Sequence, residues 1–358
     1  YPSWVQWYEY TGIFGGSLWV LAINSWIWNI YRERMTSGTW PRRQAFGILL
    51  VILLPIGFGA VQYYSYDLPD GDTEIAIIQP NFEPHYQKFN YSQRDQLKRF
   101  IALSDSILTP ETEYLVYPET SFGYVRINDI EKDYRIRAMQ DIVATHPGLK
   151  LVTGLATYVE YDEYVDIPTI RMSDRTKDTI YYEVQNSAIQ ITEGQEIDPY
   201  YKSKLVPGPE ILPYRNVLFF LEPLIALLDG TSAGHTMQKE REVFSSPTAR
   251  VAPIICYESI YGAYVGDYLK KGADILFIVT NDGWWDKTPG HIQHLKLGAL
   301  RAIEHRRPIA RSANTGISCF INERGDILQP TEYGETTAIR GELNSAPKVV
   351  TFYTRWGD

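Results

Sequence analysis

The chain has 358 residues, a net charge of −9, and 44% hydrophobic, 14% aromatic and 22% charged residues. This composition excludes a disordered or collagen-like protein, and the negative charge argues against a nucleic-acid partner. Two cysteines exclude a disulfide-rich scaffold and a four-cysteine zinc site. The length fits two structural units, or one large α/β domain with an added region.

Two long uncharged stretches lie near the beginning of the chain, from Tyr10 to Tyr31 and from Gln44 to Tyr66. Each exceeds the roughly 20 residues that a helix needs to cross a bilayer, so we predict transmembrane helices over about 10–31 and 44–66. A pair of buried core helices is the alternative, but core helices rarely lack a polar face over such a length. Aromatic residues typical of membrane interfaces lie near the ends of both stretches, namely Trp4, Trp7, Tyr8, Tyr31, Trp40, Tyr63 and Tyr64.

The arginines between the two stretches predict their orientation. Residues 1–66 have a net charge of +2, which leaves −11 on the rest of the chain. Positively charged loops stay in the cytoplasm, so the loop with Arg32, Arg34, Arg42 and Arg43 is expected there, and everything after residue 66 outside. Because the chain begins with Tyr close to a span, we interpret it as an excerpt of a larger multi-pass membrane protein.

The pattern changes after residue 72 to short apolar runs that alternate with helical spacing, which is typical of a sheet covered by helices. We predict one α/β domain over 72–344 and a return segment toward the membrane over 345–358. An apolar segment, 217–228, fits either a helix under the core or a flap facing the lipid. Strand-like runs occupy 74–81, 114–120, 150–159, 179–192, 251–260 and 273–285, and helical spacing marks 92–108, 137–147 and 291–308.

Reactive side chains follow three of these segments, where open α/β sheets commonly place their sites. They are Glu119 after YLVYP, Cys256 and Glu258 after VAPII, and Lys202, Lys204 and Glu210 in YYKSKLVPGPE. The six histidines do not form a metal-ligand pattern, so no metal and no cofactor is expected. His291 and His294 lie three residues apart, and we expect them on a helix surface.

Cys256 is a candidate nucleophile because a strand leads into it. A thiol needs a base or a nearby cation to react well at neutral pH. Glu119 is a candidate base, and Lys202 together with the backbone N–H of Tyr257 is a candidate for stabilising an oxyanion. Each residue also has an ordinary interpretation. Cys256 could be a buried apolar thiol, Glu119 the start of a loop and Lys202 a surface lysine. A disulfide between Cys256 and Cys319 is a further alternative, which would consume the nucleophile.

The order Glu119, Lys202, Cys256, in the contexts YPET, YYKSKLVPGPE and ICYES, resembles the nitrilase superfamily. Within it, the chain more closely resembles the bacterial apolipoprotein N-acyltransferases. The similarity extends to WVQWYEYTGIFGGSLWVLAIN, IAIIQPN, NSAIQI, TNDGWW, HLKLGALRAIEHRRPIARSANTGIS and TFYTRWGD, and so covers nearly the whole chain. The resemblance implies an α/β fold, a nitrilase-like α-β-β-α sandwich, preceded here by two transmembrane helices.

The resemblance also implies roles for individual residues. Glu119 matches the general base, Lys202 the cation of the triad and Cys256 the nucleophile. Supporting site positions match Glu210, Glu258, Tyr257 and Asn186, and Trp284 and Trp285 are candidates for guiding acyl chains or for packing. The sequence departs from the family pattern at two places, where Lys204 replaces a usual histidine and Pro207-Gly208-Pro209 precedes Glu210.

The implied reaction moves a fatty acyl group from a phospholipid, through a Cys256 thioester, to the α-amine of diacylglyceryl-cysteine in an apolipoprotein, with ping-pong kinetics. The implied location is the bacterial inner membrane, with the catalytic domain on the periplasmic side, and the bilayer is itself a partner. A membrane-tethered amidase or hydrolase of the nitrilase type is the first alternative. A non-enzymatic assembly module on an inactive scaffold is the second.

Overall fold

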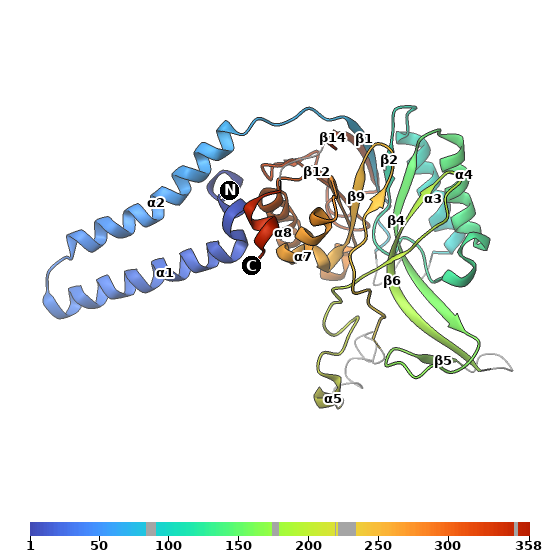
Figure 1. Ribbon diagram of the computed structural model, residues 1–358, viewed down its shortest axis with the longest axis horizontal. Coiled ribbons are helices and arrows are strands. Elements are labelled where there is room, and N and C mark those ends of the chain that lie inside the picture. The colour runs from blue at the N-terminus through green and yellow to red at the C-terminus, as the bar shows by residue number, and fades with distance from the viewer. Residues whose placement is uncertain (84–90, 174–178, 219, 221–233, 347–349) are drawn as a thin grey trace.

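The computed structural model describes the chain except for residues 84–90, 174–178, 219, 221–233 and 347–349. Two β-sheets lie face to face, with helices on both outer faces, and a helical hairpin extends from one end (Figure 1). The α-β-β-α sandwich and the two candidate membrane helices confirm the predicted fold class. Most of the apolar segment 217–228 falls outside the described residues.

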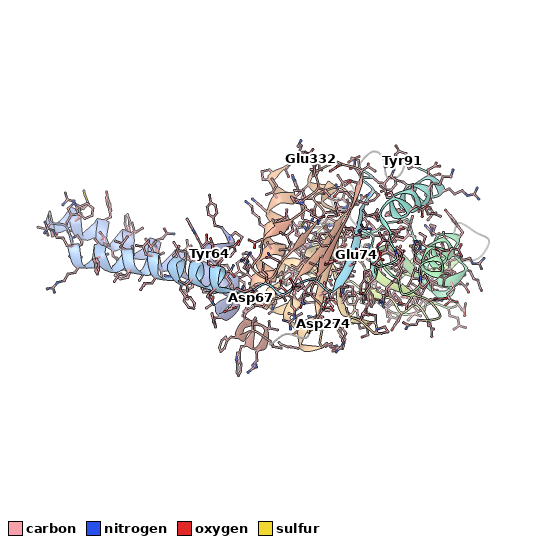
Figure 2. All side chains as sticks on the ribbon, turned by 90° about the horizontal axis from the view of Figure 1, so that it is seen from above. Tyr64, Asp67, Glu74, Tyr91, Asp274 and Glu332 are labelled. Carbon is pink, nitrogen blue, oxygen red and sulfur yellow. The ribbon has the colours of Figure 1, made fainter. Side chains whose placement is uncertain are left out.

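The hairpin consists of α1 (Tyr8–Ser37) and α2 (Arg42–Ser65), which are both long and apolar enough to cross a membrane. Only 11% and 6% of their most apolar windows are buried, so these are not the core helices of the alternative interpretation. Figure 2 shows the hairpin projecting from the α/β body, with Tyr64 and Asp67 near the base of α2. The helices leave their apolar side chains outside the protein core, as expected of a surface that faces lipid.

The first sheet has a mixed arrangement. In the order β14-β1-β2-β4-β6-β5, the strands β1, β2 and β4 are parallel, and the long hairpin of β4 and β6 is antiparallel. The carboxyl ends of the parallel strands therefore meet at one edge. The strands are β1 (Thr73–Gln79), β2 (Tyr114–Val116), β3 (Val125–Arg126), β4 (Lys150–Tyr161), β5 (Arg171–Ser173), β6 (Ile180–Thr192), β7 (Tyr200–Tyr201) and β14 (Thr337–Leu343).

The second sheet has the order β13-β12-β11-β10-β9-β8 and contains a parallel centre formed by β9, β10 and β11. The central strands are almost fully buried, which matches the continuous apolar runs in the sequence. The strands are β8 (Phe244–Ser245), β9 (Arg250–Ile255), β10 (Ile275–Thr280), β11 (Ile309–Ala313), β12 (Cys319–Ile321) and β13 (Ile327–Leu328).

Two hydrophobic cores hold the layers together. One joins the first sheet to α3 and α4, and the other fills the space between the sheets and extends under α7 and α8. Figure 1 shows α3 and α4 on the far side of the first sheet from α7 and α8. The remaining elements are α3 (Gln93–Ile107), α4 (Tyr134–Thr145), α5 (Arg215–Leu218), α7 (Gly262–Lys270), α8 (Pro289–His305), α9 (Phe352–Trp356), and the 3-10 helices η1 (Pro2–Trp4), η2 (Ile127–Lys132), η4 (Cys256–Ile260) and η5 (Asp282–Trp285).

The hairpin is attached to the α/β body where α1 packs against α8 and α9. Gly12 kinks α1 with a φ of +61°, a left-handed conformation that side chains disfavour. A Cβ atom at this position would overlap the ring of Tyr353. The backbone N–H of Ile13 donates to Glu304 Oε1 of α8 over 2.9 Å. The kink therefore lets the first helix lie directly on the α/β domain.

Candidate active site

Glu119 lies just after β2, at the edge where the parallel strands end. Its side chain is buried, and the adjacent strand β4 presents Gly154 to it. A Cβ at Gly154 would lie 2.6 Å from Glu119 Cα and 2.9 Å from the carbonyl oxygen of Pro118. The backbone that carries Glu119 can therefore approach β4 this closely only because residue 154 has no side chain.

Lys202 follows the short strand β7 and is completely buried. Its Nζ lies 3.1 Å from Glu119 Oε1 and 2.9 Å from Glu210 Oε1. Burial disfavours the ammonium, but the carboxylates of Glu119 and Glu210 hold the pKa of Lys202 above its ordinary value. Lys202 is therefore a fixed positive charge, and the interpretation of a surface lysine is wrong.

Cys256 is the first residue of η4 and has a φ of +47°, so the chain turns sharply at the end of β9. This strained backbone is typical of residues held for function. Burial and the Glu119 carboxylate raise the pKa of the Cys256 thiol, while Lys202 lowers it. The thiol therefore depends on a base for its reaction, and the charges of both other candidate residues act on it. Both cysteines are free and buried, so no disulfide joins Cys256 to Cys319.

Asn186 and Glu210, both predicted as supporting residues, contact the triad candidates directly. Asn186 Nδ2 donates to Glu119 Oε1 over 2.8 Å and to Glu210 Oε1 over 2.9 Å. The other Glu210 oxygen accepts from the backbone N–H of Val206 over 2.8 Å. Burial raises the pKa of the Glu210 carboxyl, but Lys202 and these hydrogen bonds bring it below its ordinary value. The side chains of Glu119 and Glu210 therefore share one buried lysine.

Glu258 binds the backbone of the two segments that carry Lys202 and Cys256. Its Oε2 accepts from the backbone N–H of Ile255, the residue before Cys256, over 2.8 Å. Its Oε1 accepts from the backbone N–H of Ser203, the residue after Lys202, over 2.7 Å and from the hydroxyl of Tyr200 over 2.7 Å. Burial raises the pKa of Glu258 against these hydrogen bonds. Glu258 therefore ties the segment of the nucleophile to the segment of the lysine.

The remaining predicted residues are aromatic, and they range from the half-buried Tyr257 to the exposed Trp284 and Trp285. Tyr257 stacks edge-to-face on Tyr261, with 5.4 Å between ring centroids. Trp284 and Trp285 form the last turn of η5, and both side chains are exposed. Trp285 also contacts the ring of His294. The structure brings these residues to the site region, and their role in guiding acyl chains stays a prediction.

A buried charged cluster behind Cys256 was not predicted from the sequence. Asp282 Oδ1 lies 2.9 Å from His294 Nδ1, and Asp282 Oδ2 lies 2.7 Å from Arg311 Nη2. The other ring nitrogen of His294 lies 3.2 Å from the carbonyl oxygen of Cys256 and 2.9 Å from Ser259 Oγ. Burial opposes the charge of Asp282, but Arg311 and His294 hold the pKa of its carboxyl below the ordinary value.

The expectation that His291 and His294 lie on a helix surface is wrong, since both side chains are buried. Helix α8 packs its histidine face against η4 and η5, where Asp282 and the carbonyl of Cys256 bind His294. Asp282 follows β10 directly in the sequence, at a carboxyl strand end, and that position was the available signal. Within the described part of the chain, no group of three or more His, Cys, Asp and Glu residues is arranged to hold a metal ion.

Asn281 was also not predicted as a site residue from the sequence. Its backbone N–H donates to Glu119 Oε2 over 3.1 Å, so it completes the hydrogen bonding of the candidate base. Like Asp282, it stands at the carboxyl end of β10, in the motif TNDGWW. The position of the motif at a strand end was the available signal, but the sequence does not reveal which of its polar groups turns inward.

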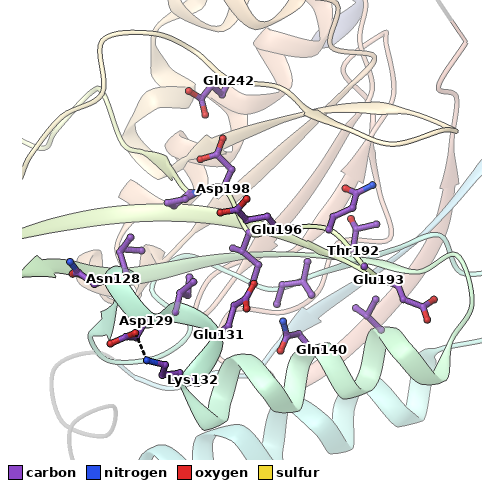
Figure 3. A pocket seen from close by; sticks show the side chains of 18 of the residues that line it. Asn128, Asp129, Glu131, Lys132, Gln140, Thr192, Glu193, Glu196, Asp198 and Glu242 are labelled. Atoms are coloured by element: carbon purple, nitrogen blue, oxygen red, sulfur yellow. Dashed lines mark hydrogen bonds and ion pairs between the residues drawn. The ribbon is translucent and has the colours of Figure 1, made fainter.

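A separate cavity of about 1270 Å³ lies between η2, α4 and the segment that precedes β7. Figure 3 shows acidic side chains around it, with Lys132 paired to Asp129. None of the triad candidates lines this cavity. Its acidic residues are Asp129, Glu131, Glu193, Glu196, Asp198 and Glu242. Because they do not define a ligand by themselves, we assign no function to it.

The arrangement of a buried carboxylate, lysine and cysteine at the ends of two stacked sheets can be compared with known proteins. A family model described as "Carbon-nitrogen hydrolase" matches residues 74–346. The chain belongs to the carbon-nitrogen hydrolase family. Solved members of the nitrilase superfamily share its fold, including Saccharomyces cerevisiae Nit3 (TM-score 0.53, 16% identity, 78% of this chain and 92% of that one). A mutant amidase from Nesterenkonia AN1 is similar to the same degree (TM-score 0.51, 16% identity, 80% and 95%).

Among carbon-nitrogen hydrolases, the chain is similar to proteins named apolipoprotein N-acyltransferase, which confirms the resemblance found in the sequence. The protein from Chlorobaculum tepidum is 28% identical over 99% of this chain and 66% of its own length. The protein from Bdellovibrio bacteriovorus is 28% identical over 98% of this chain and 62% of its own length. The chain thus spans about two thirds of the length of these curated relatives.

Proposed function

We propose that this chain is the catalytic part of an apolipoprotein N-acyltransferase, with Glu119, Lys202 and Cys256 as its triad. The observation that carries the proposal is the ion pair of 3.1 Å between Lys202 and Glu119, formed beside a buried thiol on which both charges act. The similarity to named acyltransferases and the attached membrane hairpin support the same reaction.

In the first proposed step, Glu119 takes the proton of Cys256, and the sulfur attacks the carbonyl carbon of a phospholipid ester. The raised pKa of the thiol makes a base necessary, and Glu119 is the carboxylate that raises it. Lys202 and backbone N–H groups stabilise the negative oxygen of the tetrahedral intermediate. The ester C–O bond then breaks, the lysophospholipid leaves with the proton from Glu119, and a thioester remains on Cys256.

In the second proposed step, the α-amine of a diacylglyceryl-cysteine attacks the thioester carbon. Glu119 accepts a proton from the amine, the C–S bond breaks, and the thiolate takes that proton. The product is an N-acylated apolipoprotein and a restored thiol. Because one nucleophile serves two substrates in turn, the kinetics are expected to be ping-pong.

The membrane hairpin gives this reaction a location. Both proposed substrates have acyl chains in a bilayer, so a catalytic body fixed to two spanning helices receives them without their transfer through water. The four arginines at the end of α1 and the start of α2 support a cytoplasmic hairpin turn and a periplasmic catalytic domain at the bacterial inner membrane. Phospholipid, diacylated apolipoprotein and the bilayer are thus the proposed partners.

The proposal is tested by mass spectrometry of the membrane-embedded protein after exposure to phosphatidylethanolamine vesicles. We expect Cys256 to gain the mass of one fatty acyl group, and a diacylated lipopeptide added next to remove it and become N-acylated. The Cys256→Ala variant is expected to do neither. Cys319→Ala is the matched control, since Cys319 is also buried but lies in β12, and it is expected to behave as the wild type.

Two outcomes would favour the alternatives. Release of free fatty acid with no acylated lipopeptide would indicate a membrane-tethered hydrolase, since a hydrolase shares the acyl-enzyme step. A Cys256→Ala protein that still supports lipoprotein maturation in cells would indicate a non-enzymatic module and would refute the catalytic proposal.

A further inference from the structure

The side chain of Asn281 carries an open hydrogen-bond donor inside the site. The residue is 2% exposed, and its Oδ1 accepts from Asn314 Nδ2 over 3.1 Å. Its Nδ2 has no hydrogen-bond partner within the described residues. Buried amide donors are nearly always paired, so an open one at a reaction site calls for a partner that binds there.

The open atom is a donor and not an acceptor, because the neighbouring amide fixes its orientation. Asn314 Oδ1 accepts from the backbone N–H of Phe82 over 3.0 Å, and Asn314 Nδ2 donates to the carbonyl oxygen of Phe82 over 2.7 Å. Since a backbone N–H only donates and a carbonyl only accepts, the Asn314 amide has one orientation. Its Nδ2 then requires the oxygen of Asn281, which leaves Asn281 Nδ2 open.

The donor is carried by a residue that is bonded to the proposed base and lies next to the nucleophile. The Asn281 backbone binds Glu119 Oε2, as described above. In the ladder of β9 and β10, Val279 lies opposite Ile255, so the residues that follow, Thr280 and Cys256, are also neighbours. The side chain of Thr280 donates to Asp282 Oδ1 over 2.9 Å and also acts to lower the pKa of the Cys256 thiol.

We infer that Asn281 is a substrate-binding residue whose Nδ2 donates to the carbonyl oxygen of the acyl group attached to, or attacked by, Cys256. This oxygen is an acceptor in the ester and in the thioester, and it becomes negative in the tetrahedral intermediates between them. A donor held in place before the reaction stabilises that charge without reorganisation. The inference rests on the proposed acyl transfer and adds a side-chain donor to Lys202 and the backbone.

The test compares two reactions of the same thiol in the membrane-embedded protein. Acylation by phosphatidylethanolamine vesicles develops an oxyanion, whereas alkylation by iodoacetamide does not. We expect Asn281→Ala to slow acylation of Cys256 by about 100-fold, as for the loss of one oxyanion donor, and to change alkylation by less than about threefold. Asn281→Leu fills a similar space without a donor or a charge, so it provides the same comparison if the alanine variant does not fold.

Asn128→Ala is the matched control, since this asparagine binds Glu160 on the surface of η2, and it is expected to change neither rate. Equal slowing of acylation and alkylation in the Asn281 variants would assign Asn281 to positioning of the thiol and overturn the inference. Unchanged acylation would also overturn it. Failure of the wild-type protein to form any acyl-Cys256 would instead refute the proposed function, so the two failures are distinguishable.

Discussion

Arg306 and Glu9, which are 297 residues apart in the chain, form an ion pair with 2.5 Å between Nε and Oε2. Glu9 belongs to α1, and Arg306 follows the last residue of α8. The guanidinium also donates to Gln6 Oε1 and stacks on the ring of Tyr66. One buried arginine therefore binds the segments before and after the membrane hairpin to the catalytic domain.

Removal of this arginine is expected to destabilise the junction. Arg306→Met leaves Glu9 without its cation in a largely buried place, and loss of one partner of such a pair costs about 3 kcal/mol. Thermal unfolding in detergent measures the effect, and Arg94→Met on the exposed face of α3 is the control. If Glu9→Gln, Arg306→Met and the double variant show additive losses, the ion pair does not carry the stability.

Glu304 predicts a pH dependence at the same junction. Burial raises the pKa of its carboxyl to about 7, although Arg301 lowers it. Because the folded pKa is above the unfolded value of about 4.3, this group favours folding fully at pH 4 and loses that contribution as the pH rises through 7. We expect Glu304→Gln to flatten the stability profile between pH 5 and 8. An unchanged slope would show that other groups cause the dependence.

Gly154→Ala tests how closely the strands must pack beside the proposed base. The new Cβ would meet backbone atoms of Glu119 and Pro118, which no rotamer change can relieve. We expect a loss of about 1–3 kcal/mol in the free energy of unfolding, together with slower acylation of Cys256. Gly57→Ala in α2 is the control, because a Cβ there has no atom within 4 Å. Normal acylation in the Gly154 variant would mean that Glu119 tolerates the displacement.

The cluster of Asp282, His294 and Arg311 predicts that one substitution strongly lowers the stability of the protein. Asp282→Asn removes the charge that binds Arg311 and His294, and an uncompensated buried cation costs about 3 kcal/mol. The depressed pKa of Asp282 means that its contribution is present above the unfolded value of about 3.9 and is lost only as the pH falls below it. Chemical denaturation at pH 7 measures the loss. Asp105→Asn, on the exposed side of α3, is expected to change stability by less than about 0.5 kcal/mol.

The layered fold was predictable because apolar runs and helical spacing alternate along the chain, and the spans because Tyr10–Tyr31 and Gln44–Tyr66 lack any charge. The convergence of Glu119 and Lys202 followed from the strand ends, together with the resemblance to a known family. Asn281 and His294 were not predictable in the same way. Their roles depend on which polar atoms turn inward, and partners such as Asn314 and Cys256 set that orientation in the folded protein.

The burial of Cys256 also affects its sensitivity to oxidation. The thiolate is the form that reacts with peroxides and exchanges with disulfides, and exposure controls both reactions. Only 8% of the Cys256 residue surface is accessible, and the neighbouring carboxylate disfavours ionisation. Burial and the neighbouring carboxylate make the sulfur dependent on a base for its proposed reaction. In an oxidising compartment, the same two features would also protect the sulfur from oxidation.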